Sequence, residues 1–154
     1  MYKITACKSQ RGVVSVGRWL NSLEARWNEW AQVEEAMSRT LAGRSILRVA
    51  GPRTPRLNSS GVRTVPAADL TRVAGTYEAG LACFCLGELA AEDRADFLTK
   101  LHGRLKEGAT AVFADRRSEG CGAAFELHEL FAPVGTKLDI QVGRTFWWVR
   151  YELR

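Results

Sequence analysis

Four cysteines have the chemistry to bind a metal or to act as nucleophiles. Cys7, Cys83, Cys85 and Cys121 form no C-x-x-C pair, although zinc sites depend on such close spacings. Cys83 and Cys85 lie in the apolar run 79–86, where an extended chain places both on one face. We therefore predict buried thiols, no disulfide and no metal site.

Two histidines and one carboxylate are candidates for proton transfer. His102 and His128 each lie among apolar positions with helical spacing, which favours a structural role for both. Glu88 follows directly after the apolar run 79–86 and is a candidate general base. A surface acid or a helix-start acid fits the same position, so Glu88 is a catalytic candidate for the case in which the chain is an active enzyme.

Basic residues are concentrated in the first half of the chain. Residues 1–75 hold twelve Lys and Arg against five acidic residues, a net +7, and residues 76–154 hold ten against twelve, a net −2. Such asymmetry indicates a nucleic acid, an acidic partner or an anionic ligand. Because no basic run is interleaved with aromatic residues on one face, a nucleic-acid partner is the least favoured of the three.

Length and composition predict one domain, spanning residues 1–154. The chain is 46% hydrophobic and 25% charged, as in ordinary globular proteins, and no apolar stretch approaches the roughly 18 residues of a membrane helix. The first ten residues lack the apolar run of a signal peptide, so a cytoplasmic location is expected. Residues 1–16 have no clear period and are predicted to be an irregular arm.

A long helix is predicted over 17–42. Apolar residues recur there at steps of three and four, and Gly43 ends the pattern. The residues that form this stripe are Trp19, Leu23, Trp27, Trp30, Val33, Met37 and Leu41.

The rest of the chain alternates strands with helices. Short β-branched or continuous apolar runs predict strands at 45–50, 62–65, 79–86 and 109–115. Helices are predicted from about 90 to 105, closed by residues 106–108, and at 123–131. Two runs at 137–143 and 145–153 predict a final antiparallel hairpin, with Trp147 and Trp148 on opposite faces. We therefore predict a mixed α/β sheet.

From residue 77 to the end, the sequence resembles class I S-adenosylmethionine-dependent methyltransferases of the type that modifies small molecules. The stretches that carry this resemblance are 86–89 (LGEL), 92–98 (EDRADFL), 101–109 (LHGRLKEGA), 112–115 (VFAD) and 146–151 (FWWVRY). The resemblance implies a Rossmann-like sheet, mostly parallel, that ends in an antiparallel hairpin. It covers about half of the chain.

The cofactor half departs from the family's pattern. After the strand at 45–50, Gly51 is the one glycine of a turn that is Gly-rich in the family, and Pro52 and Pro55 remove two N–H donors. Arg48 stands where the family commonly has an acid. The eleven residues 51–61 leave too little room for a crossover helix, so part of the first βαβ half is expected to be missing: most of the first crossover helix, the second strand and the following helix.

The resemblance implies S-adenosylmethionine as the cofactor and assigns residues to it. The candidates are Ala50, Gly51, Asp69, Leu70 and Cys83. Asp69 is the sole acid between Glu35 and Glu78, which makes it the candidate for a ribose or adenine contact. A turn residue that caps the following segment is an equal alternative for Asp69.

Tryptophans are candidates for contact with another chain. Trp19, Trp27 and Trp30 lie on the predicted N-terminal helix, and Trp148 lies on the last strand. Docking of this helix on its own sheet is the simplest interpretation, and a lid over a cofactor pocket is another. A surface that buries a partner is the third.

Three functions follow from these features. The first is a non-catalytic, methyltransferase-like subunit that pairs with another chain of the same fold, either an active methyltransferase that it supports or a second copy of itself. The second is a compact, active S-adenosylmethionine-dependent methyltransferase for a small nucleophilic metabolite. The third and least supported is a basic nucleic-acid-binding module.

Overall fold

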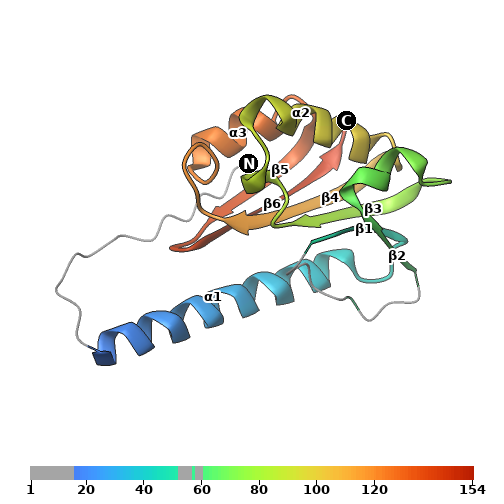
Figure 1. Cartoon of the computed structure of the whole chain (residues 1–154). Coiled ribbons are helices and arrows are strands. Elements are labelled where there is room, and N and C mark those ends of the chain that lie inside the picture. Colours follow the sequence, from blue (N-terminus) through green and yellow to red (C-terminus); the bar gives the residue numbers. More distant parts are fainter. Residues whose placement is uncertain (1–15, 52–56, 58–60) are drawn as a thin grey trace.

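In the computed structural model, six strands form one mixed sheet in the order β2-β1-β3-β4-β6-β5 (Figure 1). The structure describes residues 16–51, 57 and 61–154, with side chains from residue 22 onward. The predicted arm 1–16, apart from Val16, therefore lies outside the described residues, as do Cys7 and most of the loop 51–61. The strands are β1 (Ile46–Ala50), β2 (Val62–Pro66), β3 (Tyr77–Cys83), β4 (Leu105–Arg116), β5 (Gly135–Val142) and β6 (Phe146–Leu153).

The strand directions confirm the predicted fold class. β1 pairs in parallel with β2 and β3, and β3 pairs in parallel with β4. β6 pairs antiparallel with both β4 and β5, which is the predicted terminal hairpin. Since parallel strands run in the same direction, the carboxyl ends of β1, β3 and β4 lie along one edge of the sheet.

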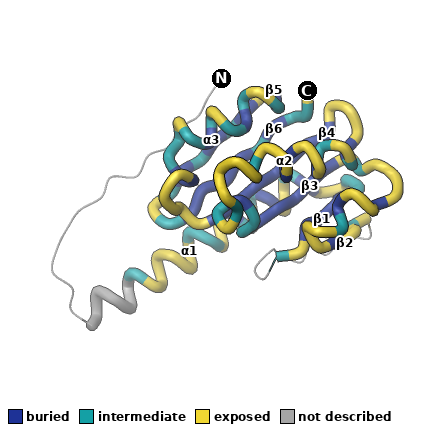
Figure 2. The backbone as a smooth tube through the Cα atoms, turned by 45° about the horizontal axis from the view of Figure 1, so that its top comes forward, coloured by how far each residue is buried: buried dark blue, intermediate teal, exposed yellow. Residues whose placement is uncertain are grey.

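Helices cover the two faces of the sheet unequally. The helix predicted over 17–42 is α1 (Val16–Leu41), and it packs alone on one face among the described elements (Figure 1). The other face carries α2 (Ala91–His102), α3 (Ala124–Phe131) and the short 3-10 helix η1 (Ala67–Arg72). Figure 2 shows the central strands buried between these layers, whereas the part of α1 beyond the sheet is largely exposed.

Each face has its own apolar core. Met37 and Leu41 of α1 are buried on Ile46, Leu81 and their neighbours. On the other face, residues of α2 and α3 pack on a larger cluster that includes Phe113 and Tyr151. Trp147 belongs to the α2 and α3 side and Trp148 to the α1 side, which confirms that these rings point to opposite faces.

Two local predictions are wrong. α2 ends at His102, where the Arg104 N–H donates to the carbonyl of Leu101 in a tighter i to i−3 hydrogen bond. Residues 106–108 belong to β4. Leu105 already pairs with Tyr77 of β3, and Gly108 adopts a φ of 69° within β4. The apolar spacing of a helix therefore continues by coincidence into a strand.

The expected loss of the second strand is also corrected. β2 forms a five-residue strand in register with β1, from Ile46 opposite Val62 to Ala50 opposite Pro66. η1 then takes the chain from β2 toward β3. None of the described residues between β1 and β2, which are Gly51, Leu57 and Gly61, lies in a helix. The second strand is therefore present, and the missing crossover helix stays a prediction because residues 52–56 and 58–60 lie outside the described part.

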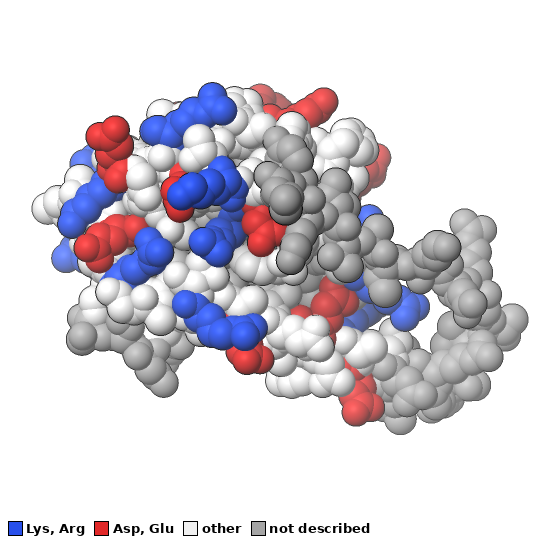
Figure 3. All heavy atoms as spheres, turned by 180° about the vertical axis from the view of Figure 1, so that it is seen from behind, with Lys and Arg blue, Asp and Glu red and all other residues white. Residues whose placement is uncertain are grey.

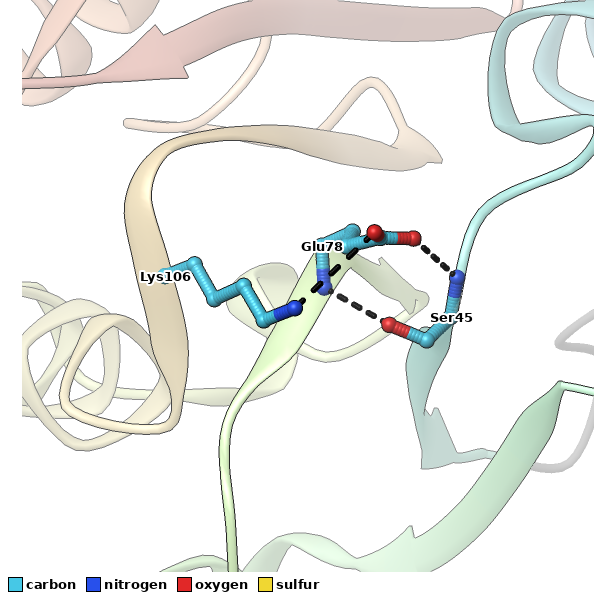
Figure 4. Close-up of polar contacts among 3 residues, drawn as sticks. All are labelled: Ser45, Glu78 and Lys106. Carbon is cyan, nitrogen blue, oxygen red and sulfur yellow. Dashed lines mark hydrogen bonds and ion pairs between the residues drawn. The ribbon is translucent and has the colours of Figure 1, made fainter.

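A small polar cluster fixes the register of the parallel strands at their amino ends (Figure 4). The Ser45 N–H donates to Oε2 of Glu78 at 2.9 Å, and the Glu78 N–H donates to Oγ of Ser45 at 3.0 Å. Lys106 Nζ lies 3.9 Å from Oε1 of Glu78. The Ser45 N–H and, after it, the Lys106 charge hold the pKa of Glu78 below its usual value. This edge is structural, and it lies opposite the carboxyl ends.

The two thiols of the run 79–86 do not share a face, contrary to the prediction. Cys83 belongs to the α1 side and Cys85 packs against the other cluster. The strand ends at Cys83, and Phe84 turns the chain with a φ of 55°. Cys83, Cys85 and Cys121 are free thiols, and burial raises the pKa of Cys85 to about 12. They are therefore protonated near neutral pH and not reactive.

The described residues contain no group of three or more His, Cys, Asp or Glu side chains placed to hold a metal ion. Within the same part of the chain, no helix is both long enough and apolar enough to cross a membrane.

His102 makes the stability of the fold depend on pH. Its Nε2 shares a hydrogen bond of 2.5 Å with the fully buried Tyr151 hydroxyl, and burial lowers the pKa of His102 to about 4. Between about pH 6.5 and pH 4, this histidine is protonated in the unfolded chain and neutral in the folded chain. The stability contribution is therefore complete above pH 6.5, and it is lost as the pH falls toward 4.

Urea unfolding at pH 7.0 and pH 4.5 measures this effect. We expect the wild-type chain to lose more stability between these two pH values than His102→Gln, which keeps a polar partner for Tyr151 without titrating. Other groups with shifted pKa values, such as Asp115, are present in both proteins and cancel in the difference. Equal losses in the two proteins would contradict the assignment.

Candidate functional site

The carboxyl ends of the parallel strands are where ligands bind in open α/β sheets. β1 ends there at Ala50, β3 at Cys83 and β4 at Arg116, and the antiparallel β6 begins there at Phe146. Three of the five residues assigned to the cofactor from the sequence, Ala50, Gly51 and Cys83, lie at this edge.

These three residues differ in exposure. Ala50 is exposed and Gly51 is half-buried at the end of β1. Cys83 is fully buried, and its Sγ lies 3.7 Å from Sδ of Met37 in α1. Because α1 covers Cys83, the carboxyl end of β3 offers no open contact through this side chain.

Asp69 and Leu70 lie away from this edge, on the side of the sheet that carries α2. Leu70 of η1 is fully buried in the core, and its carbonyl accepts a hydrogen bond of 3.0 Å from Nε of Arg104. Asp69 is half-buried, and its Oδ1 lies 3.7 Å from Nη1 of Arg72. The structure therefore does not bring Asp69 and Leu70 together with Ala50 and Gly51.

A cation lies beside the carboxyl end of β1. Arg48 is 8% exposed, and its Nη1 donates to Oγ1 of Thr64 on β2 at 3.4 Å. Its charge acts to lower the pKa of Cys83 on the neighbouring strand, although burial outweighs it and the pKa of that thiol is raised. Arg48 thus places a buried positive charge on the α1 face of β1, two residues before Ala50.

A buried carboxylate connects β4 to the segment after β3. Asp115 is 6% exposed, and its Oδ2 accepts the Gly87 N–H at 2.8 Å while Oδ1 accepts the Arg116 N–H at 2.6 Å. Burial raises the pKa of Asp115 above its usual value. Because both oxygens accept backbone hydrogen bonds, Asp115 positions this edge rather than presenting a free base.

Glu88, the predicted catalytic candidate, is exposed in the short 3-10 helix η2 (Leu86–Glu88). It follows the turn at Phe84, which directs the chain toward the α2 side. Glu88 does not line the cleft described next. A surface acid is therefore the interpretation that its position favours.

A cleft of about 710 Å³ lies between α1 and the carboxyl edge of the sheet. This volume is within the range of roughly 300–1,000 Å³ that small-molecule sites occupy. The edge contributes Phe84, Arg116, Thr145 and Phe146, and α1 contributes Leu23, Arg26, Trp27, Trp30, Ala31 and Glu34.

Glu29 attaches α1 to the rim of this cleft. Its carboxylate accepts the Phe146 N–H at 2.9 Å and the Thr145 N–H at 3.0 and 3.2 Å. Gly143 makes this approach possible, because a Cβ at that position would collide with Oε1 of Glu29. Glu29 therefore fixes the separation between α1 and the start of β6.

The cleft residues Phe84, Phe146, Arg116 and Arg26 are missing from the sequence-based prediction. Phe84 directly follows β3 and Arg116 is the last residue of β4, two neighbouring parallel strands. The rule that sites lie at the carboxyl ends of such strands could therefore have selected both residues. The contribution of Phe146 and of α1 depends on contacts between distant parts of the chain, which spacing does not reveal.

The four tryptophans assigned to a partner have different environments. Trp27 is 77% exposed, whereas Trp30 packs on Phe84 and Phe146. Trp148 is buried in the core beneath α1. Trp19 lies within α1, and its side chain is outside the described part. A partner surface can therefore include Trp27, but Trp148 is occupied by the chain's own helix.

Comparison with solved structures identifies the fold. The N-methyltransferase NodS of Bradyrhizobium japonicum WM9, solved with S-adenosyl-L-homocysteine, matches with a TM-score of 0.58 at 15% identity, over 82% of this chain and 86% of that chain. The 1,6-didemethyltoxoflavin-N1-methyltransferase of Burkholderia thailandensis, solved with S-adenosylhomocysteine and 1,6-didemethyltoxoflavin, matches with a TM-score of 0.55 at 12% identity, over 94% and 93%. No protein-family model and no curated protein sequence matches the chain.

The sheet order and these similarities define a class I methyltransferase-like fold, as the sequence resemblance predicts. At such low identity the likeness concerns the fold. The function must be argued from this chain's own residues.

Proposed function

We propose that this protein is a non-catalytic member of the methyltransferase fold, a subunit that pairs with an active S-adenosylmethionine-dependent methyltransferase and supports it. The observation that carries the proposal is the buried, positively charged Arg48 on β1, two residues before Ala50 at the end of the strand. The sulfonium of S-adenosylmethionine is itself a cation, and two like charges in a weakly screened site repel each other.

The other residues assigned to the cofactor do not fit it either. A ribose contact needs a carboxylate at the carboxyl edge, but Asp69 is ion-paired to Arg72 on η1. Leu70 is core and Cys83 is covered by Met37. Asp69, Leu70 and Cys83 thus supply neither a free carboxylate nor an open contact for the cofactor, whereas Ala50 and Gly51 lie at the accessible end of β1.

Exposed apolar side chains support the pairing with another methyltransferase-fold chain. Trp27 is 77% exposed and Leu23, about one helical turn before it on α1, is 41% exposed. Large aromatic residues at such positions are typical of interface anchors. Burial of Trp27 by a partner would remove this apolar surface from water.

The first test is calorimetric titration of the purified full chain with S-adenosylmethionine. We expect no binding at concentrations up to about 1 mM, because Arg48 places a like charge near the end of β1 and the carboxylate assigned to the cofactor, Asp69, is paired with Arg72. An active class I methyltransferase titrated in the same buffer serves as the positive control. Micromolar affinity would refute the loss of cofactor binding.

The second part of the test concerns the partner. We expect the tagged chain, purified from its native host, to retain a full-length methyltransferase identified by mass spectrometry. Trp27→Ser should weaken that association, whereas Phe125→Ser should not, because Phe125 is equally accessible, at 67% exposed, but lies on α3. A monomeric chain that retains no methyltransferase would contradict the pairing.

A compact, active methyltransferase is the second candidate, and the cleft at the ends of β3 and β4 favours it. A small nucleophilic substrate could enter a volume of that size. The same titration separates the two candidates, since an active enzyme must bind S-adenosylmethionine.

Charge distribution does not favour nucleic acid as the partner. On the face shown in Figure 3, basic side chains are interspersed with acidic ones. Binding to a polyanion instead needs a continuous stripe of positive charge that follows the backbone.

A further inference from the structure

Positive charge exceeds negative charge among the residues that line the cleft between α1 and the carboxyl edge, since two arginines and one glutamate line it. Asp115, next to Arg116 in the chain, offsets part of the Arg116 charge. Arg26 and Arg116 both line it, and neither guanidinium forms a hydrogen bond or an ion pair within the part of the chain that the structure describes. The single carboxylate among the lining residues, Glu34, accepts a hydrogen bond from Nε1 of Trp30. The cleft therefore has two guanidinium groups available for an anion.

Aromatic rings form the wall of the cleft. Trp30 lies 4.8 Å from Phe84 and 5.1 Å from Phe146 between ring centroids, with interplanar angles of 50° and 53°. Trp27 stands at the rim with most of its ring exposed. Planar aromatic groups pack on such walls with stacked or tilted geometry.

The backbone at Phe84 is strained where it enters this wall. Its φ of 55° is in the left-handed region, which is uncommon for a residue with a large side chain. The Phe84 N–H is nevertheless satisfied, since it donates to the carbonyl of Ala114 at 2.9 Å. Strain of this kind concentrates at binding sites, where the surrounding contacts hold a side chain in a required position.

We propose that this cleft binds a small planar aromatic carboxylate. The ring packs among Trp27, Trp30 and Phe84, and the carboxylate accepts hydrogen bonds from the guanidinium groups of Arg26 and Arg116. This ligand site does not depend on S-adenosylmethionine. It goes beyond the proposed function, because a chain that does not bind S-adenosylmethionine would still bind a small molecule of a defined class.

Charge decides between this ligand and other occupants of an aromatic cleft. A neutral ring gains the packing but leaves both guanidinium groups unused, and a cationic ring meets two like charges. An aromatic carboxylate gains both contributions, and Arg matches the planar carboxylate in shape as well as in charge.

Titration calorimetry with three probes of matched shape tests the proposal. The probes are 2-naphthoate, 2-naphthalenemethanol and 2-naphthylmethylammonium, added to the full chain at low ionic strength without S-adenosylmethionine. We expect 2-naphthoate to bind at least about tenfold more tightly than the neutral probe, and the cationic probe to bind most weakly. Added salt should reduce the preference for the anion.

Variants assign the binding to this cleft. Arg116→Gln and Arg26→Gln should each weaken 2-naphthoate about fivefold and leave the neutral probe within about twofold. Arg72→Gln is the matched control, because that exposed arginine lies on η1 and should change nothing. Trp27→Ala should weaken both the anionic and the neutral probe to a similar extent.

Equal affinity for the three probes, no binding of 2-naphthoate at millimolar concentration, or an unchanged preference in Arg116→Gln and Arg26→Gln would overturn the proposal. These results are distinguishable from failure of the proposed function, which is decided by titration with S-adenosylmethionine. Circular dichroism of each variant confirms that it is folded before its affinity is interpreted.

Discussion

Replacing Glu29 by alanine is expected to lower the free energy of unfolding by about 2–3 kcal/mol, because hydrogen bonds to a charged group are worth more than neutral ones. The carboxylate accepts the N–H groups of Thr145 and Phe146 in a partly buried position. Alanine would leave both donors without a partner at the start of β6. The cost therefore includes their desolvation as well as the lost bonds.

Urea unfolding of wild type and variants measures this effect. Glu24→Ala is the matched control, because Glu24 is an exposed glutamate on the same helix, and it should change stability by less than about 0.5 kcal/mol. Glu29→Gln should lose less than Glu29→Ala, since the amide oxygen can still accept one hydrogen bond. A Glu29→Ala protein as stable as Glu24→Ala would show that this contact does not hold α1 in place.

The same contact has a consequence for the cleft. Among the described residues, the other contacts of α1 with the carboxyl edge are apolar: Trp30 packs on Phe84 and Phe146, and Met37 covers Cys83. Release of Glu29 would let α1 move away from β6, so the proposed aromatic ligand should bind more weakly to Glu29→Ala even where the protein stays folded. The affinity of such a site depends on the position of the helix that lines it as well as on the lining residues themselves.

The sequence predicts the order and type of the elements because their periodic patterns are local. α1, β1, α3 and the terminal hairpin all carry an apolar period with a glycine or proline at the boundary. The end of α2 is misplaced because Leu105 continues the helical spacing while it pairs with Tyr77. Pairing between strands is a contact between distant residues, and it overrides the local pattern.

The candidate site is predicted less well for the same reason. Gly51 and Ala50 are placed correctly at the end of β1 because strand and turn are adjacent in the sequence. The family resemblance and the lack of another acid between Glu35 and Glu78 favour Asp69 as a cofactor residue, but η1 places Asp69 and Leu70 on the α2 side of the sheet. Glu29 and Thr145 are 116 residues apart, and neither residue type signals the contact. Long-range positions of this kind follow from the folded sheet and not from spacing.

Gly135→Ala is expected to lose about 3 kcal/mol of stability, the upper range for forcing an extra methyl group into a packed core. Gly135 begins β5, and a Cβ there would lie 2.7 Å from Cγ and 2.9 Å from Cβ of Tyr151. Tyr151 is fully buried: it packs on Phe131 and Phe113 and shares a hydrogen bond with His102. The ring has no free space into which it can move.

Two further variants show whether the expected loss of stability comes from lack of space at Gly135 or from any replacement of glycine by alanine. Gly103→Ala should be nearly neutral, because its added Cβ would meet the Thr99 carbonyl at an ordinary 3.5 Å and its φ of −62° suits any residue. Tyr151→Leu is destabilising alone, but Gly135→Ala should cost less in that background, since the colliding ring is gone. Unfolding measurements on the four proteins of this double-mutant cycle therefore give a coupling energy of at least about 1 kcal/mol. Additive losses would instead place the cost of Gly135→Ala in the backbone of β5 and not in its contact with Tyr151.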